Sequence, residues 1–351
     1  MSQSAQQTQI LPATPNGVAQ GAALLRAGAL VAFPTETVYG LGGDATNAAA
    51  VARIFAAKGR PQFNPLIVHV PDLETAQRVA VFPPGALALA RRFWPGPLTL
   101  VLPLRPGAGI CPAVTAGLPD VAIRVPAHPL AQALLRATAR PVAAPSANPS
   151  GGVSPTRALH VLASLSGRIA AVIDGGPCAV GIESTILGFG GGPGTGGIET
   201  ADTDIGDTDS GDTYTGGAVL LRPGGLALAV LEAALGHPIA HPTHAADPTH
   251  GALPSAPGQL ASHYAPAARL RLNATSAAPG EVLIGFGAVP GRFTLSARGD
   301  LAEAAAALFH LLRAADAAAG PEGQIATAPI PETGLGLAIN DRLRRAAAPR
   351  P

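Results

Sequence analysis

The stretch Ala29–Ala45, ALVAFPTETVYGLGGDA, decides how the rest of the chain can be interpreted. It begins with an apolar run that resembles a strand, Ala29–Phe33, and passes through polar residues into a glycine-rich segment, GLGGDA at 40–45. A segment with apolar residues at helical spacing, Thr46–Ala57, follows directly. A strand, a polar turn and a helix in this order are typical of a mixed α/β domain, in which sites gather where strands end.

The same alternation continues outward through the first two-thirds of the chain, with most runs bounded by Gly or Pro. The expected strands are Ala29–Phe33, Leu66–Val70, Leu98–Leu102, Val121–Val125, Val142–Ala144, Ala170–Ile173, Ser184–Gly188 and Ala218–Leu221. The expected helices are Asn16–Ala27, Thr46–Ala57, Asp72–Val81, Ala86–Phe93, Pro129–Ala137 and Pro155–Leu165. Asn16 and Ser154 are expected to cap the first and the last of these helices.

The length of 351 residues suggests two domains or one large domain, and a hydrophobic content of 47% is ample for a sizeable core. Residues 190–217 are rich in Gly, Asp and Thr, so they are predicted to be a flexible insertion in a loop. Further on, one strand and two helices are expected at Glu281–Phe286, Leu301–Ala318 and Gly336–Ala347. We therefore predict a first domain at 15–224, a linker at 225–265 and a smaller C-terminal α/β domain at 266–351.

Charge and hydropathy exclude several classes of protein. A net charge of +1 does not indicate a nucleic-acid binder, although a local basic cleft is compatible with it. No apolar run approaches the roughly 18 residues needed to span a bilayer, and the polar N-terminal segment does not resemble a signal peptide. The two cysteines, Cys111 and Cys178, fit no zinc or redox spacing. We therefore expect a cytoplasmic protein without membrane contacts.

The basic residues contain one unusual member. Of the 23 Lys and Arg residues, only Lys58 is a lysine, and it stands in the triplet Lys58-Gly59-Arg60. A composition so strongly biased toward Arg suggests that this lysine does something a guanidinium cannot do. A compact ammonium acting on phosphate as a point charge is one such role. The triplet therefore predicts a basic cleft that holds phosphate.

The common nucleotide-binding and catalytic motifs are absent. There is no G-x-x-x-x-G-K-[ST] loop, because Lys58 follows Ala57. The segment GLGGDA resembles a dinucleotide fingerprint, but Lys58 and Arg60 stand where such a site needs an acid, so its glycines are expected to allow a tight turn or a close backbone approach. No G-x-S-x-G elbow, H-E-x-x-H motif or nucleophile–base pair is present. Covalent catalysis is therefore not expected.

The remaining motifs resemble a known family. They are FPTETVYGLG (33–42), KGR (58–60), NPLIVH (64–69), WPGPLT (94–99), VAIRVP (121–126), APSAN (144–148), GIESTI (181–186) and LRPG (221–224). In order and spacing, apart from the insertion, they resemble the YrdC-type family of threonylcarbamoyl-adenylate synthases. Residues 257–266 resemble the linker of its long, two-domain members, and residues 334–346 resemble the end of their C-terminal domain.

This resemblance implies a fold, an activity and partners. The fold would be a twisted mixed sheet with helices that form a basic cleft, followed by a smaller Rossmann-like α/β domain. The family condenses L-threonine, bicarbonate or CO2, and ATP into threonylcarbamoyl-adenylate and pyrophosphate, and the product serves threonylcarbamoyladenosine (t6A) synthesis on tRNA. Positioning and stabilisation of phosphate charge would suffice for such a step, in keeping with the missing nucleophile. Mg2+ is expected with ATP, and the t6A transfer machinery and tRNA are expected partners.

The resemblance also assigns residues. Lys58 and Arg60 would be catalytic, and no protein metal site is expected. The residues expected to hold L-threonine are Thr37, His69, Arg124 and Ser184. The residues expected to contact ATP are Arg60, Asn64, Ala144, Ser146, Asn148, Ser154, Arg222 and Tyr264, the last of which would close over the nucleotide from the linker. Asp120 stands where the family is expected to have Thr, and an acid there would weaken phosphate binding.

Two alternatives remain. Hydrogenase-maturation proteins adenylate carbamoyl phosphate with a similar domain, but they add zinc fingers, for which two cysteines are too few. The other alternative is an RNA-binding module of the same fold without catalysis. The small net charge and the lack of an aromatic stacking motif count against it. The two classes differ in turnover, which an assay with threonine, bicarbonate and ATP measures.

Overall fold

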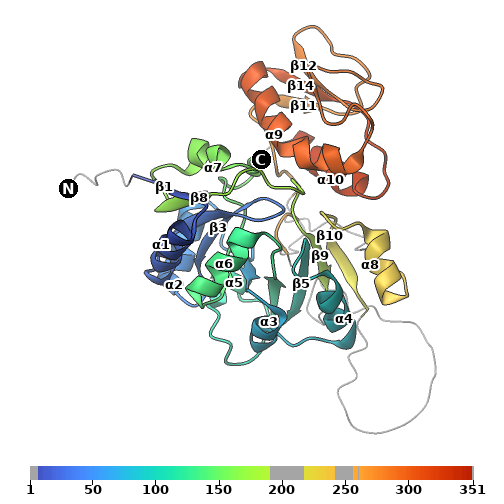
Figure 1. Ribbon diagram of the computed structural model, residues 1–351. Helices are drawn as coiled ribbons and strands as arrows, with labels where there is room; N and C mark the ends of the chain where they lie inside the picture. Colours follow the sequence, from blue (N-terminus) through green and yellow to red (C-terminus); the bar gives the residue numbers. More distant parts are fainter. Residues whose placement is uncertain (1–6, 190–216, 242–255, 260, 350–351) are drawn as a thin grey trace, which may run out of the picture.

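The computed structural model describes residues 7–189, 217–241, 256–259 and 261–349, which form two domains. The predicted insertion at 190–217 lies outside the described residues except for Gly217. Figure 1 shows the large N-terminal domain and, above it, the smaller C-terminal domain with α9 and α10 facing the large one. Within the described ranges, no helix is long and apolar enough to cross a membrane.

A mixed ten-stranded sheet organises the large domain, in the order β1-β8-β2-β3-β7-β4-β6-β5-β9-β10. Its strands are β1 (Gln9–Pro12), β2 (Val31–Pro34), β3 (Tyr39–Asp44), β4 (Ile67–His69), β5 (Leu98–Pro103), β6 (Asp120–Arg124), β7 (Val142–Ala143), β8 (Ala171–Asp174), β9 (Thr185–Gly188) and β10 (Val219–Arg222). The sheet contains both parallel pairs such as β4–β6 and antiparallel pairs such as β5–β6. The mixed sheet expected from the resemblance is therefore confirmed.

Helices cover this sheet. They are α1 (Pro15–Arg26), α2 (Ala48–Lys58), α3 (Leu73–Val79), α4 (Pro84–Phe93), α5 (Pro112–Thr115), α6 (Pro129–Thr138), α7 (Ala158–Leu165) and α8 (Leu228–Leu235). Two predicted caps are wrong. Thr14, not Asn16, caps α1 by accepting a hydrogen bond from the Gly17 amide. Helix α7 begins three residues later than predicted, at Ala158, so Ser154 is free to bond elsewhere.

The glycine-rich segment is a strand, which the sequence analysis missed. β3 pairs antiparallel with β2, so that Phe33 faces Gly40 and residues 35–38 form the turn between the two strands. A Cβ at Gly42 would lie only 2.9 Å from the Phe33 ring, so a side chain has no room there, whereas the expected approach of this backbone to a ligand stays a prediction. The turn is closed by the Thr35 hydroxyl, which donates to the Val38 carbonyl oxygen at 2.6 Å. This geometry brings the polar residues of the turn to one end of the sheet.

The small domain contains a parallel four-stranded sheet in the order β11-β14-β12-β13. Its elements are β11 (Arg269–Arg271), β12 (Glu281–Gly285), β13 (Phe293–Thr294), α9 (Leu301–Ala319), β14 (Gln324–Thr327) and α10 (Gly336–Ala347). A parallel sheet with helices is the α/β arrangement that was predicted here. The segment predicted as a linker also contains α8, whose Leu231 packs in the core of the large domain.

The two domains share a hydrophobic core. Val38, Val153 and Ile182 of the large domain belong to the cluster built around Phe309 and other residues of α9. Gly181 permits this contact, because a Cβ there would lie 2.4 Å from the Ala306 Cα on α9. The segment before β9 is therefore pressed against the C-terminal domain, and that segment also forms part of the pocket described next.

Candidate active site

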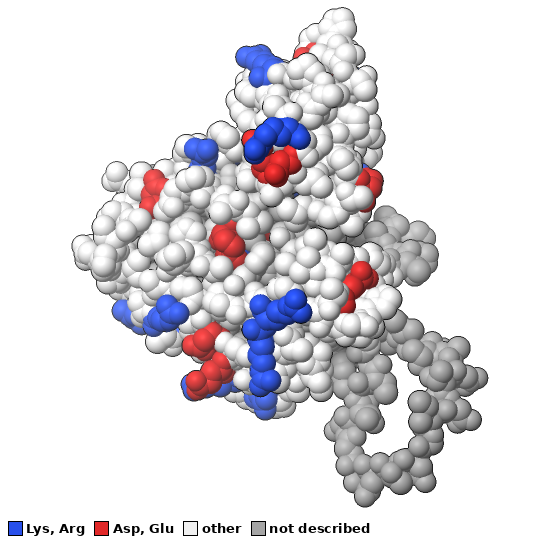
Figure 2. All heavy atoms as spheres, turned by 45° about the vertical axis from the view of Figure 1, so that its right-hand side comes forward, with Lys and Arg blue, Asp and Glu red and all other residues white. Residues whose placement is uncertain are grey.

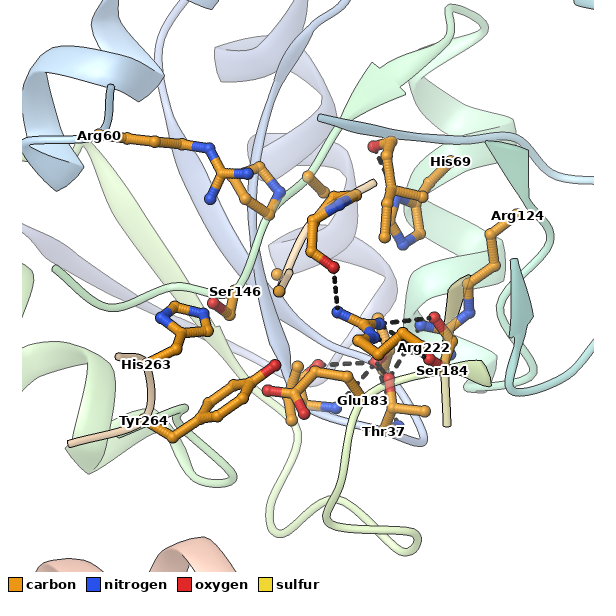
Figure 3. Close-up of a pocket in the computed structure, with 18 residues that line it drawn as sticks. Thr37, Arg60, His69, Arg124, Ser146, Glu183, Ser184, Arg222, His263 and Tyr264 are labelled. Carbon is orange, nitrogen blue, oxygen red and sulfur yellow. Dashed lines mark hydrogen bonds between the residues drawn. The ribbon is translucent and has the colours of Figure 1, made fainter. Parts of the chain in front are cut away.

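A polar pocket lies at the ends of the central strands, where the linker after β10 crosses the large domain. Of the predicted site residues, it brings together Thr37, Arg60, His69, Arg124, Ala144, Ser146, Ser184, Arg222 and Tyr264. Figure 3 shows the two halves of the pocket: on one side Thr37, His69, Arg124 and Ser184, and on the other Arg60, Ser146, His263 and Tyr264. Arg222, which was predicted to contact ATP, lies beside Ser184 in the first half, and which ligand each half binds stays a prediction.

Arg124 dominates the first half. It is 3% exposed at the end of β6, and its guanidinium donates to Glu36 Oε1 at 2.6 Å, Thr37 Oγ1 at 2.9 Å and the Gly96 carbonyl oxygen at 3.2 Å. These three bonds fix the group and leave its other N–H donors for a ligand. Glu36, which was not predicted as a site residue, neutralises one charge here. Asp120 lies at the opposite end of β6 and outside the pocket lining.

His69 is a neutral hydrogen-bonding group. Its Nδ1 lies 3.2 Å from the Ile67 carbonyl oxygen, which can only accept, so Nδ1 carries the proton and Nε2 is an acceptor. Burial and the charge of Arg124 lower the pKa of His69 to about 3. Beside it, the Ser184 hydroxyl lies 2.7 Å from the Thr99 hydroxyl, at the start of β9. This half thus offers a cation, a neutral acceptor and hydroxyl groups within one small space.

Acidification is expected to destabilise the fold through His69. Its pKa is about 3 in the folded chain, against the ordinary value of 6.5, so between these values only the unfolded state binds the proton. Stability is therefore intact above about pH 6.5 and falls as the pH drops, by roughly 2 kcal/mol at pH 5 from this residue. Urea unfolding at pH 7.5 and pH 5 should show a smaller loss in His69→Gln than in the wild type. Equal losses in both proteins would contradict this assignment.

Arg60 dominates the second half. It is 8% exposed, just beyond the C-terminus of α2, which Gly59 ends with a left-handed conformation. Its Nη2 donates to Asn64 Oδ1 at 2.6 Å and to the Pro65 carbonyl oxygen at 2.8 Å. Burial lowers the pKa of Arg60 to about 10. Asn64 does not line the pocket, so in this conformation it contributes by holding Arg60.

Lys58 lies beside the pocket and not in its lining. The side chain is 3% exposed, and its Nζ donates to the carbonyl oxygens of Ser146 and Asn148 at 2.5 Å each. Burial, together with the charge of Arg60, pushes its pKa well below the ordinary value. The only lysine therefore ties the end of α2 to the loop that carries Ser146. Direct contact of Lys58 or Asn148 with phosphate stays a prediction.

Glu183 is a lining residue that the sequence analysis did not assign. Its Oε1 accepts from the Ser154 hydroxyl at 2.5 Å, which explains why Ser154 does not reach the pocket lining. Its Oε2 accepts from Nε of Arg342, on α10 of the C-terminal domain, at 3.1 Å. Next to it, Arg222 donates to the Ser184 carbonyl oxygen at 2.8 Å. An acid directly before the predicted site residue Ser184 was the sequence signal that could have identified Glu183.

The linker enters the pocket through His263 and Tyr264. Tyr264 is 1% exposed, and its φ of 61° lies in the left-handed region that non-glycine residues rarely adopt. Its hydroxyl and the Nδ1 of His263 are buried and make no hydrogen bond to the described residues. With these side chains in place the cavity measures about 50 Å³. The linker therefore occupies space that a nucleotide would need.

Comparison with known proteins agrees with this geometry. Residues 23–195 match the Sua5/YciO/YrdC family, described as telomere recombination, and residues 227–348 match the C-terminal domain of threonylcarbamoyl-AMP synthase. The threonylcarbamoyl-AMP synthase of Bacillus subtilis is 42% identical over 95% of this chain and 93% of its own length. That of Pyrococcus abyssi is 39% identical over 94% and 93%, respectively.

A solved structure extends the similarity to the arrangement of both domains. The crystal structure of P. abyssi Sua5 complexed with L-threonine superimposes with a TM-score of 0.81 at 37% identity, and the match covers 97% of this chain and 98% of the other. Sequence and structure thus agree over nearly the whole length. The chain therefore belongs to the threonylcarbamoyl-AMP synthase family, in the form that carries the C-terminal domain.

Proposed function

We propose that the pocket is the active site of an L-threonylcarbamoyladenylate synthase, a nucleotidyltransferase that joins L-threonine, bicarbonate or CO2, and ATP and releases pyrophosphate. The observation that supports this most directly is the pairing of two different ends in one pocket. One end, around Arg124 and His69, suits an amino acid, and the other, around Arg60, suits phosphate. The relative from P. abyssi was crystallised with L-threonine, which fits the first end.

Threonine would bind at the Arg124 end. A guanidinium with free N–H groups is suited to a bidentate grip on the α-carboxylate. The Nε2 atom of neutral His69 would accept a hydrogen bond from the amine, and the hydroxyls of Thr37 and Ser184 would select the side-chain hydroxyl. A site that pairs with a substrate hydroxyl strongly rejects analogues that lack it. Discrimination against amino acids without a hydroxyl group is therefore built into this end.

The chemistry needs no protein nucleophile. The threonine amine would attack CO2 to form a carbamate with loss of one proton. A carbamate oxygen would then attack the α-phosphorus of ATP, the bond to the β-phosphate oxygen would break, and pyrophosphate would leave. Holding the reactants together and stabilising phosphate charge supply the catalysis. Arg60 and Arg222, 8% and 4% exposed, are suited to that task because a buried guanidinium interacts strongly with phosphate.

Mg2+ would enter with ATP. The described residues contain no group of three metal-ligating side chains, and both oxygens of Glu183, a carboxylate in the pocket lining, are already engaged by Ser154 and Arg342. Mg2+ usually keeps several waters and is held largely by substrate phosphates, so this pocket is compatible with it. When bound, the ion would neutralise phosphate charge.

The linker would have to move before ATP binds. Ligand pockets usually measure about 300–1,000 Å³, whereas this one holds about 50 Å³ with His263 and Tyr264 in place. The two buried but unpartnered groups of these residues then become available to a ligand. We propose that Tyr264 withdraws to admit the nucleotide and returns over it, with Ser146, Ala144 and Asn148 on the opposite side.

The product would serve t6A synthesis on tRNA, together with the transfer machinery. We also place the chain in the cytoplasm, in keeping with two buried cysteines that form no disulfide. The alternative of an RNA-binding module is not favoured. On the face in Figure 2, acidic and basic side chains are scattered over both domains without a broad basic area, whereas RNA binding by charge requires such an area.

An assay for pyrophosphate tests the proposal. The purified chain should release pyrophosphate and form threonylcarbamoyl-adenylate only when L-threonine, bicarbonate, ATP and Mg2+ are all present. Replacing threonine by 2-aminobutyrate, which lacks the hydroxyl group, should lower kcat/KM by roughly 100-fold or more. No release of pyrophosphate with the complete mixture would refute the synthase. Salt-dependent binding of RNA without turnover would support the binding module instead.

A further inference from the structure

We propose that Arg342, on the last helix of the C-terminal domain, is a positioning residue of the active site: it holds Glu183 in place for triphosphate binding and supports the position from which Tyr264 withdraws and to which it returns. This inference rests on the proposed function and gives the C-terminal domain a part in it. The guanidinium is 0% exposed, although it belongs to a domain separate from the one that carries the pocket. Its contacts with Glu183 and Tyr264 lie at the wall of the pocket, and its Nη1 also lies 3.1 Å from Asp341 Oδ2 on the same helix.

The first contact fixes an acid. Arg342 Nε lies 3.1 Å from Glu183 Oε2, and Ser154 binds the other oxygen, so the carboxylate is held from two sides. Arg342 Nη1 also donates to the Pro223 carbonyl oxygen at 2.5 Å, directly after Arg222. One guanidinium therefore connects the segment before β9 with the end of β10. The first segment carries the lining residue Glu183, and the second carries Arg222 of the nucleotide end.

The second contact fixes the linker. The Arg342 guanidinium lies 5.5 Å from the centre of the Tyr264 ring, and the Phe309 ring stacks on the same tyrosine at 5.5 Å. The linker backbone is also held, because the Ala265 amide donates to the Gly151 carbonyl oxygen at 2.9 Å. A tyrosine with a positive φ keeps this unfavourable backbone conformation only if several surrounding contacts hold it there. The C-terminal domain supplies Arg342 and Phe309 for that purpose.

Charge explains why the wall needs an arginine. Glu183 is 6% exposed and lines a pocket that should receive a polyanion. Without Arg342, its carboxylate would repel phosphate and compete with it for Arg222, on which it already acts electrostatically. Removing one member of a buried ion pair leaves the other uncompensated. Arg342 also keeps its Nη2 buried without a hydrogen bond to the described residues, which is a costly way merely to join two domains.

The test measures ATP and threonine separately. Arg342→Met should raise the KM for ATP tenfold or more and leave the affinity for threonine within twofold, because Arg124 does not contact this wall. Arg342→Lys, which keeps the charge, should fall between Arg342→Met and the wild type. When Glu183 is already glutamine, the acid that needs neutralising is gone. The fold-increase in the KM for ATP caused by Arg342→Met should then be at least three times smaller than in the wild-type background.

Two control variants distinguish a specific role of Arg342 in positioning pocket residues from a general weakening of the small domain or of the domain interface. Arg344→Met changes an exposed arginine of the same helix, paired with Glu332 inside the small domain. His310→Gln removes a ring that stacks on His160 across the domain interface, at 5.4 Å and away from the pocket. Both variants should keep the wild-type KM for ATP. If His310→Gln raises it as much as Arg342→Met does, or if Arg342→Met leaves it within twofold, the inference fails.

The outcome can be told apart from failure of the proposed function. An inactive wild type would refute the synthase, yet calorimetric binding of a non-hydrolysable ATP analogue would still compare Arg342→Met with Arg344→Met. An active wild type with indifferent Arg342 variants would refute only the positioning role. If Arg342→Met does not fold, the Glu183→Gln/Arg342→Met variant is compared with Glu183→Gln and with Arg342→Lys, and equal ATP affinity in all three overturns the inference.

Discussion

Replacing Arg124 by lysine is expected to lower kcat/KM for L-threonine by about 100-fold, which corresponds to about 2.7 kcal/mol of transition-state stabilisation. An ammonium cannot hold Glu36 and Thr37 at once and still present two parallel N–H groups to the substrate carboxylate. The loss should therefore fall on threonine, whereas the KM for ATP should stay within threefold. Steady-state kinetics with each substrate varied in turn measures both values.

Arg140→Lys is the matched control for this prediction. Arg140 also forms an ion pair with a buried acid, since its Nη1 lies 2.7 Å from Asp44 Oδ2, but it does not line the pocket. Its substitution should leave the threonine kinetics unchanged. If Arg124→Lys behaves like Arg140→Lys, the guanidinium does not grip the substrate, and the threonine end must lie elsewhere.

Lys58→Met is expected to lower kcat/KM for ATP by roughly 100- to 1,000-fold, the range measured when one preorganised donor is removed from an active site. Methionine matches the lysine side chain up to Cε but lacks the terminal ammonium, so the carbonyl oxygens of Ser146 and Asn148 lose their buried donor. Each unsatisfied group costs about 1–3 kcal/mol, so the loop that lines the pocket should shift. Any direct contact of the ammonium with phosphate would be lost as well.

Threonine affinity serves as the internal control, because the chain contains no second lysine to substitute. Calorimetric titration should give the same affinity for threonine in Lys58→Met and in the wild type, which establishes that the Arg124 end has remained folded. Lys58→Arg should rescue little, since a site with 3% exposure has no room for a larger planar group. If kcat/KM for ATP in Lys58→Met stays within threefold of the wild-type value, Lys58 is needed neither to hold the loop that carries Ser146 nor to contact phosphate.

Many of the residues that line the pocket, and many of the strands and helices, could be predicted from short stretches of sequence. Residues such as Arg124 and His69 stand at the ends of apolar runs in the sequence. These runs form strands β6 and β4, and the ends of both strands meet at one pocket. Strand β3 was missed because its glycines weaken strand propensity, and only the packing of Phe33 against Gly42 explains why glycine is needed there. Residues 39–44 form a strand because they pair with β2 and β7, and such pairing cannot be predicted from the residues of the segment alone.

Long-range contacts account for what could not be predicted. Nothing in the KGR triplet indicates that Lys58 donates to carbonyl oxygens 88 and 90 residues away, while its contact with phosphate stays a prediction. Arg342 stands in a run with Arg344 and Arg345, and nothing in that run indicates which of the three is buried 159 residues away at Glu183. A charged residue in a sequence is normally predicted to be exposed. Whether it instead forms a buried ion pair, as Arg342 does, depends on how the two domains pack against each other.

The shared core has a consequence for how the chain loses its structure. Val38, Val153 and Ile182 of the large domain are packed in the same cluster as Phe309 and its neighbours of α9. Melting the small domain would therefore uncover apolar surface on the large one, and the first residues to lose support would be those beside the PTET turn and the GIESTI segment. We therefore expect the two domains to unfold together, as one cooperative unit where the sequence suggests two.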